Sequence, residues 1–158
     1  MNTNENLIHT LYAAFASRDG AGMADCYHKD ATFADPVFLE LKGEQIGAMW
    51  KMLCLQGKDL TIEVYDIKAD EVEGQATWEA KYGFGKPPRP VHNFVHAKFE
   101  FSEGKIIKHV DHFKLWKWSR MALGPLGLML GWHSGVQKKI QQQAMSNLKK
   151  FISRTKTV

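Results

Sequence analysis

The chain has 158 residues, of which 44% are hydrophobic and 24% charged, so we expect one globular domain with a full hydrophobic core. This composition excludes a disordered or fibrous protein, and no run of about 18 apolar residues is present that could span a membrane. The net charge is +4, but residues 119–158 contain seven Lys and Arg and no Asp or Glu, which leaves −3 for residues 1–118. Because the positive charge belongs to the tail, the charge of the whole chain does not support nucleic-acid binding.

The cysteines and the N-terminal residues bear on the compartment in which the protein works. Cys26 and Cys54 are far apart and lack the spacing of a metal site, so both are expected to be buried thiols. Residues 1–6 contain no basic segment leading into an apolar one, so no signal peptide is expected. We therefore expect a cytoplasmic protein.

Three helices are predicted in the first third of the chain. Residues 5–18 repeat apolar side chains at helical spacing, residues 21–28 indicate a short second helix, and residues 44–55 indicate a third. Between the second and third helices, residues 30–38 alternate in period two, which predicts a strand.

Asp35 is the unusual residue of this strand. It shares a face with Ala31 and Phe33, where a charge is unfavourable unless it is paired or used, and Pro36 ends regular pairing directly after it. An Asp-Pro pair is also typical of a turn. The local sequence therefore leaves two interpretations open, a turn-forming residue and a carboxylate of an active or binding site.

From about residue 60 the apolar side chains recur with a period of two. This pattern predicts strands at residues 61–68, 75–85, 91–101 and 106–118, with a hairpin turn at Gly104 between the last two. Three helices followed by an antiparallel meander predict an α+β fold, with the helices packed on one face of the sheet.

Polar side chains also fall on the apolar face of the last two predicted strands. His109 and Asp111 lie on that face of the final strand, and Asn93 lies on that face of the strand before it. Such a cluster is typical of a lined cavity, and equally of a buried network in which the groups satisfy one another. The sequence leaves both interpretations open.

The C-terminal segment combines an uncharged run with a basic helix. Residues 121–132 contain no charge, and residues 135–152 place apolar side chains at helical spacing opposite a face rich in Lys and Gln. With Trp116, Trp118 and Trp132 flanking the apolar run, this segment could rest on an anionic membrane surface. The alternative is a lid over a site in the body of the protein together with a docked helix.

Two runs of sequence resemble the nuclear-transport-factor-2-like superfamily, in its SnoaL-like and ketosteroid-isomerase-like branches. They are Asp-Ala-Thr-Phe-Ala-Asp-Pro-Val at residues 30–37, and Phe-x-Phe-x-x-Gly-Lys-Ile at residues 99–106 leading into His-Val-Asp-His-Phe at residues 109–113. The resemblance covers about residues 5–118 and implies a cone-shaped, strongly curved antiparallel sheet closed by three N-terminal helices, here with an extra C-terminal helix. It also implies a pocket at the mouth of the cone and a homodimer formed through the outer face of the sheet.

The resemblance assigns roles to two carboxylates. By position, Asp35 matches the carboxylate base of ketosteroid isomerase, and Asp111 is the counterpart of the acid/base residue of SnoaL-like cyclases. The two oxyanion donors of the isomerase fall at Leu11, next to Tyr12, and at Ala97, so steroid isomerisation in the strict sense is not expected.

We therefore predict a SnoaL-like domain over residues 1–118, with an apolar loop and basic amphipathic helix over residues 119–158 packed on it. Its expected partner is a small hydrophobic, carbonyl-containing molecule, bound or transformed by carboxylate acid/base chemistry of the isomerase, cyclase or hydratase kind, without metal or cofactor. The predicted catalytic residues are Asp35, Asp111 and His109, and the predicted substrate-binding residues are Asn93, Tyr12, Phe33, Trp50, Trp78, Tyr82 and Phe113. The alternative is a non-catalytic ligand-binding or dimeric interaction module, with membrane-surface contact through the C-terminal segment.

Overall fold

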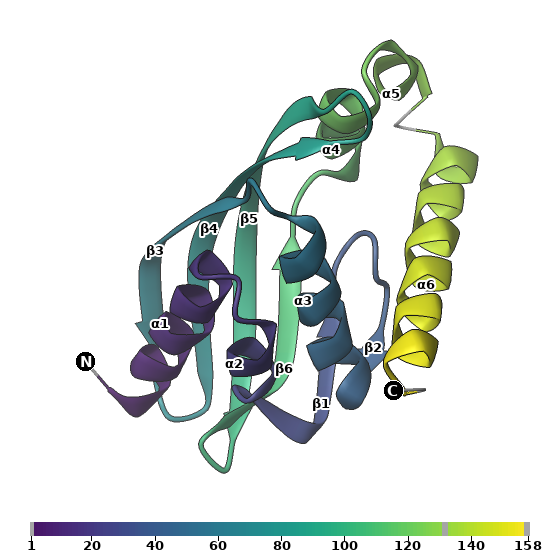
Figure 1. The fold of residues 1–158 in the computed structure, drawn as a ribbon. Helices are drawn as coiled ribbons and strands as arrows, with labels where there is room; N and C mark the ends of the chain where they lie inside the picture. The colour runs from purple at the N-terminus through teal and green to yellow at the C-terminus, as the bar shows by residue number, and fades with distance from the viewer. Residues whose placement is uncertain (1, 131–132, 157–158) are drawn as a thin grey trace.

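The computed structural model describes residues 2–130 and 133–156, and its first 112 residues form three helices and a six-stranded sheet (Figure 1). The helices are α1 (Thr3–Ala16), α2 (Gly20–Ala24) and α3 (Glu44–Gln56). The strands are β1 (Tyr27–Ala34), β2 (Leu41–Lys42), β3 (Thr61–Ala69), β4 (Glu73–Phe84), β5 (Arg89–Ser102) and β6 (Lys105–His112). Three further helices follow, α4 (Leu115–Leu123), α5 (Pro125–Leu130) and α6 (Ser134–Lys156).

The predicted α+β arrangement is confirmed, with α1, α2 and α3 on one face of the sheet (Figure 1). Helix α1 begins at a capping box, in which the Asn2 side chain accepts from the Glu5 N–H and the Glu5 carboxylate accepts from the Asn2 N–H. Its buried face packs against the inward residues of β4 and β5 and against α3. The buried core includes Ile8, Leu11, Phe15, Met49, Trp50, Ala76, Trp78, Val95, Ala97 and Phe99.

The prediction of an entirely antiparallel sheet is wrong. The strand order is β2-β1-β6-β5-β4-β3, and β1 runs parallel to β6, whereas the other neighbours are antiparallel. Period-two patterning defines which face a side chain occupies, but not which distant strand becomes the neighbour or in which direction it runs. The sheet is therefore mixed, and its first strand pairs with its last.

The first strand also begins earlier than predicted. Tyr27 and His28, assigned above to the second helix, belong to β1, and α2 ends at Ala24. A short helical pattern over eight residues is easily overridden by tertiary pairing. As a result, the Tyr27 side chain becomes part of the sheet.

The predicted final strand over residues 106–118 is too long, and the predicted apolar loop is largely helical. Strand β6 ends at His112, and α4 begins at Leu115 and packs against β5. Leu115, Ser119 and Ala122 are the buried residues of α4, and their spacing of four and three is helical. The Leu-Trp-Lys-Trp run at residues 115–118 fits both a strand and this helix. Residues 125–130 then form α5, and Trp132 lies outside the described residues.

Helix α6 forms where a C-terminal helix was predicted, and it packs beside α3 (Figure 1). Leu148 is completely buried, and Ala144, Met145, Phe151 and Ile152 pack against the core. Gln141 Nε2 donates to the carbonyl oxygen of Pro36 at 2.9 Å. No helix within residues 2–130 and 133–156 is long and apolar enough to cross a membrane.

Candidate functional site

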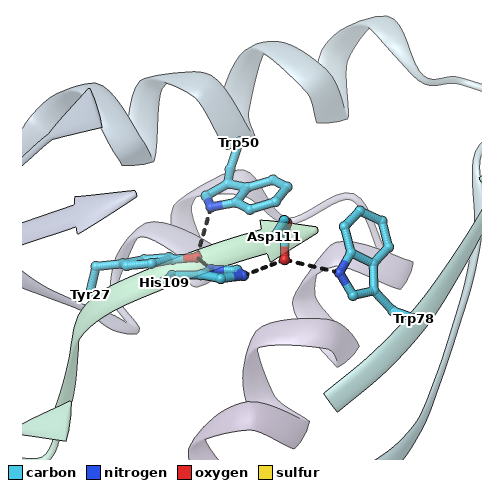
Figure 2. A network of polar contacts seen from close by, with 5 residues as sticks. All are labelled: Tyr27, Trp50, Trp78, His109 and Asp111. Atoms are coloured by element: carbon cyan, nitrogen blue, oxygen red, sulfur yellow. Dashed lines mark hydrogen bonds and ion pairs between the residues drawn. The ribbon is translucent and has the colours of Figure 1, made fainter. Parts of the chain in front are cut away.

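A buried chain of polar side chains links β1, α3, β4 and β6 beneath the helices (Figure 2). Trp50 Nε1 donates to the Tyr27 hydroxyl at 3.0 Å, and that hydroxyl is 2.7 Å from His109 Nδ1. His109 Nε2 is 2.8 Å from Asp111 Oδ1, which also accepts from Trp78 Nε1 at 3.4 Å. Of the predicted site residues, His109, Asp111, Trp50 and Trp78 are thus joined in one network.

The direction of the hydrogen bonds in this network follows from the chemistry of its two ends. An indole N–H can only donate, so Tyr27 accepts from Trp50 and its own O–H is left to donate to His109 Nδ1. His109 Nε2–H then donates to Asp111 Oδ1. The hydrogen bonds from Trp50 through Tyr27 and His109 therefore all run in one direction and end at the Asp111 carboxylate.

The network is closed off by aromatic rings. His109 is 0% exposed and Asp111 3% exposed. The Phe33 and Phe99 rings lie 5.0 and 4.4 Å from the His109 ring, measured between centroids. A histidine and a carboxylate buried to this degree are stable only because each is hydrogen-bonded.

Asp35 follows β1 directly, and the parallel pairing places it next to Asp111. The register pairs Phe33 with His109 and Ala34 with Val110, so one step further along the chains come Asp35 and Asp111. Neighbouring strands lie about 4.8 Å apart. Asp35 lies one residue beyond the last paired residue of β1, and it is close enough to Asp111 for the charge of that carboxylate to raise the pKa of Asp35.

The Asp35 side chain is held by its own turn. Its Oδ1 accepts from the backbone N–H groups of Val37 and Phe38 at 2.7 and 2.6 Å. Burial raises the pKa of Asp35 to about 7; the two backbone N–H groups oppose the shift, and the Asp111 charge adds to it. Asp35 thus forms a turn, as one interpretation of the Asp-Pro pair predicts, and it is also a carboxyl group with a strongly raised pKa.

Tyr12 contributes a buried hydroxyl with no hydrogen-bond partner among the described residues. The Tyr12 ring is 1% exposed and lies 5.9 Å from the Trp78 ring, between centroids. Burial and, secondly, the Asp111 charge raise the pKa of Tyr12 well above its usual value. A buried hydroxyl without a partner is unfavourable, so it is available to a polar atom of a ligand.

The remaining predicted site residues lie towards α4, away from the network. The Tyr82 hydroxyl accepts from Trp118 Nε1 at 2.7 Å. Asn93 and Phe113 line a hollow of about 390 Å³ between β5, the end of β6 and α4. Neither this hollow nor a second one of about 720 Å³, lined in part by β3 and β4, includes Asp35, His109 or Asp111.

Tyr27 is the member of the network that the sequence reasoning missed. It was assigned to a helix, and its parity with Phe33 does not correct this, because Lys29 has the same parity and is exposed. The pairing of β1 with β6 also shifts in register between Tyr27 and Thr32, so the alternation does not run from Phe33 back to Tyr27. Among the described residues, no group of three or more His, Cys, Asp or Glu side chains could hold a metal ion.

A model of the SnoaL-like domain matches residues 8–109 of the chain. Among solved structures, TerC co-crystallised with polyporic acid is similar with a TM-score of 0.67 at 13% identity, covering 78% of this chain and 100% of that one. An LEH-like epoxide hydrolase of M. tuberculosis has a TM-score of 0.63 at 18% identity, covering 81% and 95%. A putative polyketide cyclase of Xanthomonas campestris has a TM-score of 0.62 at 16% identity, covering 74% and 94%.

No functionally curated protein matches the chain. At identities of 13–18%, the similarity to these solved structures is a similarity of fold alone.

Proposed function

Because this chain belongs to the family of SnoaL-like domains, we propose that it binds a small hydrophobic molecule inside the domain and transforms it by acid/base chemistry of Asp35 and Asp111. The substrate class is a carbonyl compound or an epoxide, whose reactive oxygen needs a proton donor and whose carbon framework is apolar. The reaction is an isomerisation, a cyclisation or a hydration.

The observation that carries this proposal is the raised pKa of Asp35, about 7, beside a second inward carboxylate. A general acid or base works best when its pKa is close to the working pH. Two neighbouring carboxyl groups in different environments are a recurring arrangement for moving a proton on and off a substrate. A turn-forming Asp with no further role would not need a partly buried position close to a second carboxylate.

We assign the roles from the hydrogen bonds. In an isomerisation or cyclisation, Asp35 takes a proton from the substrate and returns it to the product. In a hydration, it takes a proton from the water molecule whose oxygen bonds to the substrate carbon, and that proton is delivered to the substrate oxygen, so one water molecule is consumed and no oxidant or reductant is needed. Both hydrogen bonds that Asp111 accepts from the described residues use its Oδ1. Its Oδ2 is therefore left for the substrate or for water. Both His109 nitrogens are bonded within the network, so His109 positions Asp111 instead of touching the substrate.

Tyr12 supplies the remaining polar contact in this proposal. Its unpartnered hydroxyl would donate to the substrate oxygen as negative charge develops there. The binding space is the cone-shaped pocket expected from the family, with Phe33, Trp50 and Trp78 as its apolar wall. These rings are tightly buried, so ligand entry requires them to shift and should change the tryptophan fluorescence.

The relatives support the substrate class without defining it. They include a protein co-crystallised with polyporic acid, an epoxide hydrolase and a putative polyketide cyclase. Function can differ between proteins of one fold, so the assignment rests on the site of this chain.

A second candidate function is a non-catalytic ligand-binding or dimeric interaction module. One observation favours it, because the Oδ1 atoms of both Asp35 and Asp111 are already satisfied by donors of the protein. Such a network can simply stabilise one unique core.

The test compares the wild-type protein with Asp35→Asn, using the exposed Asp30→Asn on the same strand as a control. Each protein is incubated with styrene oxide, and separately with 1-indanone in heavy water, while diol formation and deuterium incorporation are followed. We expect Asp35→Asn to lose at least about a hundredfold in rate and Asp30→Asn to lose none. Quenching of tryptophan fluorescence by these compounds, without any turnover in the wild type, would favour the binding module instead.

A further inference from the structure

The C-terminal helices form an acid-free extension of the domain. The family match ends at residue 109, before α4 begins. Residues 113–158 contain nine Lys and Arg and no Asp or Glu, which leaves −5 for residues 1–112. The extension is therefore positive throughout, on a body that is negative.

Helix α6 does not offer an apolar face to a membrane. Leu148 is fully buried, and Met145 and Phe151 pack against the core, so the apolar side of this helix is used within the protein. What α6 leaves outside is its basic side, including Lys138 and Lys139 in its first turns, both exposed.

Helix α5 differs, because it keeps large apolar side chains outside. Leu126 is 60% exposed and Met129 70% exposed, and residues three apart lie on the same side of a helix. Figure 1 shows α5 at the top of the molecule, beyond α4. The pair Leu126 and Met129 is therefore an apolar tip on the acid-free extension.

Exposed cations precede and follow this tip in the sequence. Lys117 and Arg120 are exposed on α4, which packs against α5. Lys138 and Lys139 lie at the start of α6, a few residues after α5. Apolar side chains beside exposed Lys and Arg, on helices α4, α5 and α6 that carry no Asp or Glu among their described residues, are the chemistry that suits the surface of an anionic bilayer.

We propose that α5 is a contact site for an anionic lipid bilayer. Leu126 and Met129 enter the boundary between headgroups and acyl chains, and the cations of α4 and α6 lie against the lipid phosphates. A nucleic acid would use the same cations but would gain nothing from the two apolar side chains, so the tip favours a bilayer. This contact is independent of the chemistry proposed for Asp35 and Asp111.

The test is sedimentation of the full-length protein with vesicles of phosphatidylcholine alone, or mixed with phosphatidylglycerol. We expect binding to the mixed vesicles only, weakened by added NaCl. The double variant Leu126→Ser/Met129→Ser should bind at least about tenfold more weakly. The matched control is Leu39→Ser/Val72→Ser, because these residues are similarly exposed, 64% and 67%, but lie in the acidic body.

A second pair of variants separates charge from apolar contact. Lys138→Gln/Lys139→Gln should also lower the partitioning into the mixed vesicles by about tenfold, whereas Lys29→Gln/Lys51→Gln on the body should not. Circular dichroism of each variant checks that it is folded. Equal binding to neutral and anionic vesicles, or unchanged binding of the Leu126→Ser/Met129→Ser variant, would overturn the proposal. So would absence of vesicle binding, including the case in which the protein binds a DNA duplex instead.

Discussion

Burial decides the chemistry of individual residues in this protein. Asp35 and Tyr12 both have raised pKa values because their charged forms lose hydration, and the Asp111 charge acts on both. Asp35 is the group for which this matters near neutral pH, since its pKa of about 7 keeps both protonation states populated there.

The raised pKa of Asp35 predicts a specific dependence of stability on pH. Folding favours the protonated form, so this group's contribution to stability is full below pH 3.8 and is lost as the pH rises towards about 7. The total effect is about 4 kcal/mol, the shift between those two values multiplied by about 1.4 kcal/mol per unit. Asp35→Asn should remove this loss, measured by urea unfolding between about pH 4 and pH 8. Asp30→Asn is the control and should keep the pH dependence of the wild type. If the free energy of unfolding depended on pH equally in the wild type and in Asp35→Asn, the prediction would be contradicted.

The two inner tyrosines allow a matched comparison. Tyr27→Phe leaves Trp50 Nε1 without an acceptor and His109 Nδ1 without a donor, so it should lower the free energy of unfolding by about 1–3 kcal/mol. Tyr12→Phe removes a hydroxyl that has no partner among the described residues, so its effect should be within about 0.5 kcal/mol or stabilising. Chemical denaturation measures both, and equal losses would show that the Tyr27 network does not stabilise the fold.

At the scale of elements, α6 is tied to the turn that carries Asp35. Gln141 Nε2 donates to the Pro36 carbonyl oxygen, and the N–H groups of the next two residues hold Asp35 Oδ1. The chain beyond the family match is thus in contact with the candidate site.

This contact predicts that Gln141→Ala loosens the turn of Asp35. The amide hydrogens of Val37 and Phe38 should exchange faster, and the protein should lose about 0.5–1.5 kcal/mol of stability. Gln143→Ala is the control, because Gln143 bonds only to Asn147 on the same helix among the described contacts. NMR measures the amide exchange rates. Equal rates at Val37 and Phe38 in Gln141→Ala and Gln143→Ala would contradict the prediction.

At the scale of the whole molecule, the outer face of the sheet is the expected dimer interface. Phe94 on β5 is 57% exposed, and its ring lies 4.4 Å from the His92 ring, between centroids. Helices α1, α2 and α3 cover the other face, and α4 reaches this face only at one end, where Lys117 and Met121 line a hollow together with Phe94. The rest of this face is available to a second copy of the chain.

We expect a homodimer that Phe94→Asp converts to a monomer, because burying an unpaired charge between two sheet faces is strongly unfavourable. Light scattering coupled to size-exclusion chromatography measures the molar mass. Leu55→Asp is the control, since Leu55 is 66% exposed at the end of α3. A wild-type monomer, or a Phe94→Asp variant that remains dimeric, would contradict the expectation.

Local patterns in the sequence predicted the inner faces of the fold correctly. Period-two alternation identified Phe33 on β1 and His109 and Asp111 on β6 as inward residues, and the helical repeat identified α3 and α6. These features depend only on the spacing of neighbouring residues, because side chains alternate on a strand and repeat every three or four residues on a helix. The inward positions of Phe33, His109 and Asp111 on their own strands were thus determined by the sequence itself.

Contacts between distant residues were decided only by the tertiary structure. The parallel pairing of β1 with β6 brings Asp35 next to Asp111, although the sequence pattern suggested an entirely antiparallel sheet. The same pairing brings Tyr27 to His109, and packing on β5 turns residues 115–118 into a helix. Strand partner and strand direction depend on segments about 80 residues apart competing for the same edge, and no local period encodes that choice.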